Sequence, residues 1–223
     1  GDGTKLMSHV VVDGRTTIGS GCKIFPFACL GGVTQDLKYK GDVTFVEIGD
    51  NTTIRENVTV NSGTNEGEVT KIGSDCLLMA YSHVAHDCHV GNHTIFANGA
   101  SLGGHVDIGD YVILGGFALI HQFVKVGAYS FCGMGCGVSK DVPPYIIISG
   151  NPAAAHGLNN VGLKRRGLSD SSIKGLREAY RIIYKSGLKL ADAVEEVKSR
   201  LPDCAEAQNF ADFIANAERS IVR

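Results

Sequence analysis

The sequence predicts a parallel β-helix followed by a small helical domain, on the strength of three observations. From Ile72 onward, every sixth residue is apolar for twelve consecutive hexads. A period of six fits neither an amphipathic helix nor a simple alternating strand. Glycine accounts for 29 of the 223 residues, which is about twice its usual share. After Asn151 and Pro152 the six-residue period gives way to the helical spacing of apolar residues.

Each hexad is interpreted as a short strand and a tight turn, so that three hexads make one triangular coil of 18 residues. The first and fifth positions of the hexad are expected to point inward. Glycine is expected where the chain turns with a positive φ. The fifth-position cysteines are therefore interpreted as small core residues. They are Cys22, Cys76, Cys88 and Cys136.

The domain boundaries follow from where this pattern holds. We expect residues 1–152 to form the β-helix, with excursion loops near residues 33–46 and 61–71, where the register breaks. Such loops on a rigid scaffold are favoured carriers of function. Residues 153–223 are expected to form the α-helical C-terminal domain, with Ser169 as a helix N-cap. The expected helices cover residues 169–185, 190–201 and 205–221.

The start of the chain and its composition narrow the classes of protein further. The sequence opens within a hexad, so we expect a chain that lacks its first coils. Seven cysteines, an odd number, and no recognisable signal peptide predict a reduced, cytoplasmic protein. A formal net charge of −2 argues against a nucleic-acid partner. The apolar runs are too short for an integral membrane segment, and no phosphate-binding glycine motif precedes a helix.

The histidines form a second pattern, because six of the eight lie between His83 and His121. Stacked coils make residues 18 apart neighbours, so His86 shares a column with positions 104 and 122. His105 and His121 each miss that column by one residue, and His83 precedes His86 on the same coil. These side chains are therefore expected along one edge of the prism, separated by about 5 Å per coil.

A histidine ladder of this kind admits three interpretations. It could consist of solvated turn residues, of metal ligands such as a zinc site would use, or of a general base with substrate-binding imidazoles. The local sequence favours the third. Asp87 follows His86 and could orient it, and the backbone N–H of Gly104 could face a developing oxyanion. A base, an orienting carboxylate and an oxyanion donor are the components of acyl transfer.

Other polar residues indicate a phosphorylated or carrier-borne substrate. A basic cluster, Lys164 to Arg166, lies just after the β-helix. Asn159 and Gln122 could add neutral hydrogen bonds, and Asp36 and Lys38 lie on the first excursion loop.

Four sequence strings carry a resemblance to a known family. They are HVAHDCHVGNHTIFANGASLGGHV (83–106), HQFVKVGA (121–128), DVPPYIIISGNP (141–152) and GLKRRG (162–167). The chain resembles bacterial UDP-N-acetylglucosamine 3-O-acyltransferases over essentially its whole length. The resemblance implies a left-handed β-helix, a homotrimer and a cytoplasmic enzyme. It also implies the first step of lipid A biosynthesis, in which acyl carrier protein donates a 3-hydroxyacyl chain to the sugar 3-hydroxyl. No bound cofactor is implied, since phosphopantetheine arrives on the acyl carrier protein.

The resemblance also implies roles for individual residues. His86 would be the general base, Asp87 its orienting partner, and the Gly104 N–H the oxyanion donor. At Val161 many members carry a glutamate, so we expect one polar contact with the sugar to be missing. A trimer would place the site between neighbouring prisms, and one chain alone would be inactive. The positions that match substrate-binding ones are Asp36, Lys38, His83, His105, His121, Gln122, Asn159 and Arg165.

Met134 shares the turn position of His86 on another edge of the prism. In the family that the chain resembles, this position is the floor of the acyl groove, and a glycine there leaves room for a longer chain. We therefore expect Met134 to act as an acyl-chain ruler that selects a shorter 3-hydroxyacyl donor. The alternative is a methionine that fills an ordinary gap.

Three alternative functions remain open at this point. A trimeric metalloenzyme of the γ-carbonic-anhydrase kind would contain stoichiometric zinc. The related N-acyltransferase of the same pathway would accept an amine. A non-catalytic scaffold would be unaffected by the substitution His86→Ala.

Overall fold

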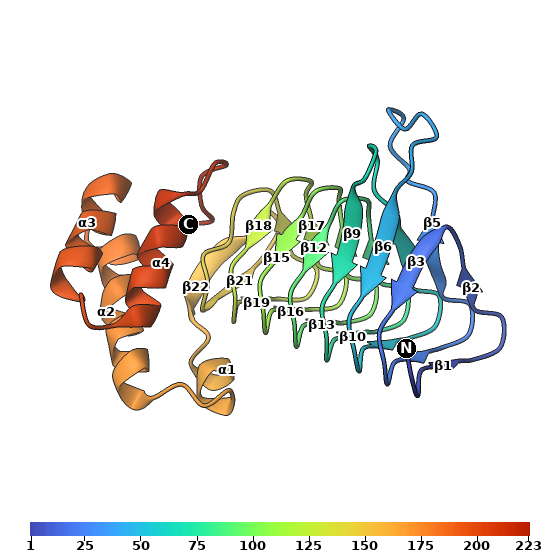
Figure 1. The fold of residues 1–223 in the computed structure, drawn as a ribbon. Helices are drawn as coiled ribbons and strands as arrows, with labels where there is room; N and C mark the ends of the chain where they lie inside the picture. Colours follow the sequence, from blue (N-terminus) through green and yellow to red (C-terminus); the bar gives the residue numbers. More distant parts are fainter.

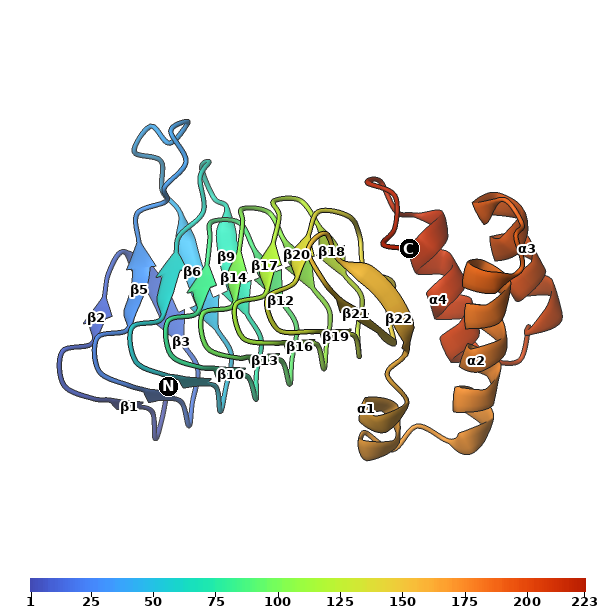
Figure 2. The same ribbon diagram turned by 180° about the vertical axis from the view of Figure 1, so that it is seen from behind.

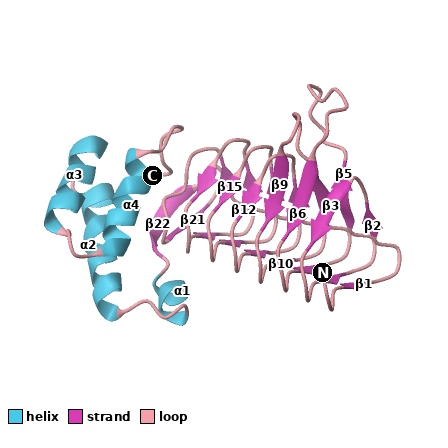
Figure 3. Ribbon diagram, in the orientation of Figure 1, coloured by secondary structure: helices cyan, strands magenta, loops and turns pink.

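The molecule is a three-sided prism of short strands with a helical domain at its C-terminal end (Figure 1). The computed structural model describes residues 1–223. Figure 3 separates the two parts, because the strands fill the prism and the helices lie together beyond its last coil. The predicted parallel β-helix and the predicted helical C-terminal region are both present.

Three sheets form the faces of the prism. The nine-stranded sheet contains β1 (Lys5–Leu6), β4 (Lys23–Ile24), β7 (Thr53–Ile54), β10 (Leu77–Leu78), β13 (Ile95–Phe96), β16 (Ile113–Leu114), β19 (Phe131–Cys132), β21 (Ile146–Ser149) and β22 (Ala154–Leu158). The seven-stranded sheet contains β2 (Val11–Val12), β5 (Cys29–Gly32), β8 (Thr59–Asn61), β11 (His83–Val84), β14 (Ser101–Leu102), β17 (Leu119–Ile120) and β20 (Gly137–Val138). The six-stranded sheet contains β3 (Arg15–Ile18), β6 (Phe45–Ile48), β9 (Val69–Ile72), β12 (His89–Val90), β15 (Asp107–Ile108) and β18 (Lys125–Val126).

The strands pair in the register that the hexads predict. His83 of β11 pairs with Ser101 of β14, which pairs in turn with Leu119 of β17. All pairs are parallel except that of β21 with β22. Because each residue lies beside its equivalent in the next coil, side chains at one hexad position form continuous columns along the prism.

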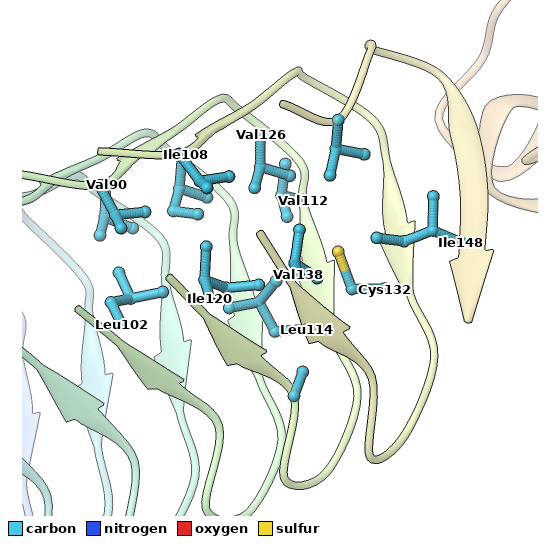
Figure 4. Close-up of a cluster of buried hydrophobic side chains, with 14 of the residues drawn as sticks. Val90, Leu102, Ile108, Val112, Leu114, Ile120, Val126, Cys132, Val138 and Ile148 are labelled. Atoms are coloured by element: carbon cyan, nitrogen blue, oxygen red, sulfur yellow. The ribbon is translucent and has the colours of Figure 1, made fainter. Parts of the chain in front are cut away.

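The first hexad positions fill the interior of the prism. All twelve apolar residues of the uninterrupted hexads are exposed by 4% or less. Figure 4 shows several of them, among them Val90, Leu102 and Leu114, which come from the six-, seven- and nine-stranded sheets. The fifth-position cysteines are buried as well, as expected of small core residues.

The expected role of glycine is wrong for most turns. The fourth position of the hexad has the positive φ, and non-glycine residues such as Tyr81 (64°), Asp87 (59°) and His105 (58°) usually occupy it. Glycine is required instead at those second positions where the coils approach closely. A Cβ on Gly109 would lie 2.6 Å from the backbone nitrogen of Ala128 in the next coil, which is far inside van der Waals contact.

The two excursion loops leave the prism at one shared edge. They span residues 33–44, between β5 and β6, and residues 62–68, between β8 and β9. Both are slightly shorter than predicted, because β6, β8 and β9 extend into the polar segments. Figures 1 and 2 show both loops rising on the same side of the prism.

The helical region begins later than predicted. Residues 154–158 form β22, which pairs antiparallel with β21 and closes the end of the nine-stranded sheet, so the expected boundary at residue 153 moves to residue 160. The helices are α1 (Asn160–Arg165), which was not predicted, α2 (Asp170–Lys185), α3 (Leu190–Arg200) and α4 (Ala205–Ala215). Ser169 caps α2 as predicted, accepting a hydrogen bond from the Ser172 N–H. None of these helices has the length and apolar character needed to span a membrane.

The C-terminal segment explains why α4 ends at Ala215 and not near residue 221. Ile221 forms a bridge with Asp141 in the last coil, and the Val222 N–H donates to the Asp141 carbonyl at 2.9 Å. The chain therefore leaves the helix to return to the prism.

The three edges of the prism differ in their side chains. The histidine edge, between the seven- and six-stranded sheets, has His86, His105 and both excursion loops. The tyrosine edge, between the six- and nine-stranded sheets, is a stack of His93, Tyr111, Tyr129 and Tyr145. The phenylalanine edge, between the nine- and seven-stranded sheets, exposes Phe27, Tyr81 and Phe117.

Two adjacent glycines test the packing argument. A Cβ on Gly115 would lie 2.6 Å from the Met134 nitrogen, whereas on Gly116 its nearest neighbour would be the Asn98 carbonyl oxygen at 3.5 Å. We expect Gly115→Ala to lower the free energy of unfolding by about 1–3 kcal/mol and Gly116→Ala to change it little. Chemical denaturation of both variants measures this, and equal stabilities would contradict the close-stacking explanation.

Candidate active site

His86 and Asp87 form a hydrogen-bonded pair in the turn after β11, on the histidine edge. The His86 Nδ1 lies 2.8 Å from the Asp87 Oδ2, and their side chains are only 13% and 6% exposed. The Thr64 Oγ1 lies 2.9 Å from the same nitrogen, and the Thr64 N–H donates to the Asp87 Oδ1 at 3.2 Å. The second excursion loop therefore contacts both members of the pair.

This geometry determines the tautomer of His86. If Nδ1 carried no hydrogen, its lone pair would face the Asp87 carboxylate at 2.8 Å, and two acceptors would repel each other. The stable arrangement places the hydrogen on Nδ1, where it is donated to Asp87. The Nε2 atom of neutral His86 then has a free lone pair, which is the state that a general base requires.

Two pKa shifts describe the electrostatics of this edge. Burial opposes ionisation of Asp87, but hydrogen bonds from His86 and from the Thr64 side chain and backbone outweigh it and lower the pKa of Asp87. Asp87 is therefore a carboxylate at neutral pH. Burial, followed by the neighbouring His86, lowers the pKa of His83 below 6.5, so His83 is neutral there too.

His105 continues the ladder in the next coil. Its ring meets the His86 ring edge-on with centroids 5.1 Å apart, and its Nε2 lies 3.7 Å from the Asp87 Oδ2. The other face of His105 stacks on Phe123 at 4.7 Å with nearly parallel rings. The structure therefore brings His86, Asp87 and His105 together, as the column argument predicted.

Gly104 lies directly against the His86 ring. A Cβ at this position would collide with the Cε1 and Nε2 atoms of His86, so only glycine allows the imidazole to sit where it does. The Gly104 carbonyl accepts a hydrogen bond from the Phe123 N–H at 3.0 Å, while the Gly104 N–H has no partner within the chain. The backbone N–H of a residue that lies against the His86 ring is therefore free to donate to a bound group.

The other predicted residues of the histidine edge surround this pair. His83 lies on β11, and its Nδ1 is 2.7 Å from the Thr59 Oγ1. Asp36 and Lys38 lie on the first excursion loop, where the Lys38 N–H donates to the Asp36 carboxylate at 2.9 Å. His121 and Gln122 are exposed in the turn after β17, one coil beyond His105.

Asn159 and Arg165 lie elsewhere, at the tyrosine edge. The Asn159 side chain is anchored to the Tyr129 carbonyl at 2.9 Å and caps α1 by accepting from the Gly162 N–H at 3.1 Å. Arg165 is exposed on α1. Figures 1 and 2 show α1 on the side of the prism away from the excursion loops. One chain therefore does not bring these two residues to His86.

Two further predicted positions are solvent-exposed. Val161 lies on the surface of α1. Met134 is 84% exposed on the phenylalanine edge, between β19 and β20.

Sequence reasoning missed Thr64, Thr59 and Phe123. Thr59 pairs with His83 in the strand register, so a corrected register across the second loop could have found it. Phe123 lies 18 residues, or one coil, after His105, so the six-residue period could have predicted their stacking as well. Thr64 lies on an irregular loop, and no sequence pattern predicts its contact with His86.

The clustered side chains also bear on the metal interpretation. Possible ligand atoms of His86, Asp87 and His105 lie within 4.8 Å of one another. The Asp87 carboxylate, however, already accepts hydrogen bonds from His86 and Thr64. Its hydrogen bonds therefore occupy lone pairs that a metal ion would need.

Comparisons with known proteins show which proteins the chain is similar to. The family model "Udp N-acetylglucosamine O-acyltransferase; Domain 2" matches residues 141–222, and the bacterial transferase hexapeptide model matches residues 70–104. LpxA from Acinetobacter baumannii is 52% identical, with a TM-score of 0.95 over 100% of this chain and 87% of its own. LpxA from Bacteroides fragilis, a UDP-N-acetylglucosamine acyltransferase, is 44% identical, with a TM-score of 0.95 over 100% and 87%.

A third similar structure is the UDP-N-acetylglucosamine acyltransferase from Campylobacter jejuni. It is 35% identical, with a TM-score of 0.92 over 100% of this chain and 86% of its own. These matches extend over the whole chain, and they confirm the predicted left-handed β-helix.

Proposed function

The chain belongs to the family of UDP-N-acetylglucosamine O-acyltransferases, and on that premise we propose a complete reaction for it. The enzyme is an O-acyltransferase of lipid A biosynthesis. In the proposed reaction, a 3-hydroxyacyl chain passes from acyl carrier protein to the 3-hydroxyl of UDP-N-acetylglucosamine. His86 is the general base. The observation that carries this role is the Asp87 contact on Nδ1, which leaves Nε2 free beside Gly104.

The chemistry follows from these groups. His86 Nε2 takes the proton of the sugar 3-hydroxyl as the oxygen attacks the thioester carbonyl. The carbonyl oxygen becomes an oxyanion, and the Gly104 N–H donates a hydrogen bond to it. The tetrahedral intermediate collapses, the carbon–sulfur bond breaks, and the imidazolium returns its proton to the departing thiolate. Asp87 stabilises the imidazolium throughout.

The remaining polar residues are proposed to bind the nucleotide-sugar. His83, His105, His121 and Gln122 lie along the edge that carries His86, and the loop with Asp36 and Lys38 rises beside them. Arg165, a basic residue of α1, and Asn159, the N-cap of that helix, are proposed to bind the diphosphate of the nucleotide-sugar. At Val161 an aliphatic side chain offers the sugar no hydrogen bond.

A homotrimer is proposed because the binding residues lie on two different edges. His86 is on the histidine edge, whereas Arg165 and Asn159 are at the tyrosine edge, with the six-stranded sheet between them. A complete site therefore requires the histidine edge of one copy beside the tyrosine edge of another. A cyclic assembly provides such a contact at each interface.

The surface of the prism supports this arrangement. From β10 onward, the outward residues of the nine-stranded sheet are apolar and half-buried, while those of the six-stranded sheet are mostly charged. The apolar residues are Leu77, Ile95, Ile113, Phe131 and Ile147. If the nine-stranded sheet packs on the seven-stranded sheet of a neighbour, the phenylalanine edges meet at the three-fold axis. Phe117, which is 68% exposed in one chain, is then covered.

The proposed reaction uses no cofactor bound to the chain, because phosphopantetheine arrives with the acyl carrier protein. The placement of the enzyme in the cytoplasm is proposed on the same ground, since acyl carrier protein and the nucleotide-sugar are both soluble cytoplasmic substrates in this scheme.

The reaction and its base are tested by one assay. We expect His86→Ala to lower transfer of the 3-hydroxyacyl chain by at least about 100-fold, since a general base typically contributes this much. The matched control is His89→Ala, which removes an exposed histidine of the six-stranded sheet. Radiolabelled UDP-N-acetylglucosamine and acyl carrier protein thioester measure the transfer, with the assembly state checked by sedimentation.

The same assay separates the alternatives. Undiminished activity in His86→Ala would remove this residue from the mechanism. Loss of wild-type activity after chelation, restored by zinc, would favour a metalloenzyme. Transfer to the amine analogue of the acceptor in preference to the hydroxyl would favour the N-acyltransferase.

Met134 is proposed to limit the acyl chain. Its exposed side chain lies on the phenylalanine edge, which the trimer would enclose, so it would occupy space at the end of the acyl groove. We expect Met134→Gly to shift the preferred donor toward longer 3-hydroxyacyl chains, measured as kcat/KM for donors of increasing length. Met7→Gly, on the first turn of the same edge, is the control. An unchanged length preference in Met134→Gly would show that the methionine only fills a gap.

A further inference from the structure

Two buried threonines link the excursion loops to the His86–Asp87 pair. The Oγ1 atoms of Thr34, on the first loop, and Thr64, on the second, lie 3.2 Å apart. The Asp36 N–H donates to the Thr34 Oγ1 at 3.1 Å. At the other end, Thr64 contacts both His86 and Asp87. An unbroken chain of polar contacts therefore runs from Asp36 to the base.

One assignment of the hydrogens gives every donor in this chain an acceptor. In it, the Thr34 Oγ1 accepts from the Asp36 N–H and donates its own hydrogen to the Thr64 Oγ1. The single hydrogen on His86 Nδ1 is directed to Asp87. The Thr64 hydroxyl, which accepts from Thr34, then donates to the Asp87 carboxylate, a hydrogen bond that helps to stabilise its charge. Every donor in the chain has an acceptor.

The residues packed around this chain of contacts restrict its movement. Thr34 and Thr64 are almost completely buried, and a Cβ on the adjacent Gly63 would lie 2.7 Å from the Asp87 Oδ1. The Asp87 N–H is held at 2.8 Å by the Thr70 Oγ1, where the second loop rejoins the prism. The loop position and the carboxylate position are therefore mutually fixed.

We propose that Thr64 and Thr34 are positioning residues that couple the first excursion loop to the orientation of the His86–Asp87 pair. The inference rests on the proposed role of His86 as base. The loop carries Asp36 and Lys38, which are proposed to bind the nucleotide-sugar. Binding of the sugar to this loop therefore also orients the His86–Asp87 pair. Neither threonine touches the reacting atoms, and both act through Asp87 and His86.

The matched control lies in the same two loops. Thr44 donates from its Oγ1 to the Ser62 Oγ at 3.1 Å, and both side chains are buried. This pair also joins the first loop to the second, but it makes no hydrogen bond to His86 or Asp87. Thr44→Val therefore removes an equivalent buried hydroxyl and loop contact without affecting the proposed chain.

The test is steady-state kinetics of acyl transfer with UDP-N-acetylglucosamine varied. We expect Thr64→Val to lower kcat about ten-fold, a part of the general-base contribution, while Thr64→Ser, which keeps the hydroxyl, stays near wild type. We expect Thr34→Val to lower kcat less and to raise KM, because it releases the Asp36 loop. Because Thr34 acts through Thr64, the double variant should have the kcat of Thr64→Val alone.

Three results would overturn the proposal. The first is a kcat and KM of Thr64→Val or Thr34→Val equal to those of Thr44→Val. The second is a kcat of Thr64→Ser as low as that of Thr64→Val. The third is a double variant in which the losses of the two single variants add fully. If Thr64→Val does not fold, the comparison of kcat and KM between Thr34→Val and Thr44→Val tests the proposal by itself. His86→Ala is measured beside them: if it stays active, the proposed base is wrong, whereas if it is inactive and the threonine variants are normal, only the coupling is wrong.

Discussion

The hydrogen-bonded stacking of each coil on the next is the constraint on which the whole site depends. Parallel pairing places equivalent turns about 4.8 Å apart, so side chains at consecutive turns must fit against one another or be absent. The His86 ring occupies this narrow space, which is why position 104 is glycine. His105 lies edge-on to the same ring at 5.1 Å. Because the interior below is filled by buried aliphatic side chains, the turns have no space to move inward.

The repeat also explains how an ordinary turn can hold the proposed base and its carboxylate. Asp87 occupies the fourth hexad position with a φ of 59°, as equivalent residues do throughout the prism. Its backbone is therefore no more strained than that of Tyr81 or Tyr111. What distinguishes this turn is the neighbouring excursion loop, whose Thr64 supplies a hydroxyl and an N–H to the carboxylate. The regular coils position His86 and Asp87, and the excursion loop that interrupts the coils supplies their polar contacts.

The periodic part of the molecule could be predicted from the sequence and the irregular part could not. The period of six predicts the buried columns, the shared edge of His86 and His105, and the positions of both loops, because each follows from counting residues along stacked coils. The contact of Thr64 with His86 depends on the path of an irregular loop, and the six-residue period does not predict that path. The helix α1 and the strand β22 have short or mixed patterns, and their formation depends on docking against β21 and Tyr129. The role of glycine was misjudged because the sequence does not distinguish a turn from a close approach.

In the proposed function, one site needs the histidine edge of one chain and the tyrosine edge of its neighbour. Mixed trimers of His86→Ala and Arg165→Ala subunits test it most directly. Each parent should be inactive, but random mixing should restore roughly a quarter of the wild-type activity, since one interface in four then carries both intact residues. If both residues served one chain, every subunit in the mixture would remain defective. A mixture no more active than its parents, or an Arg165→Ala parent with wild-type activity, would contradict the account.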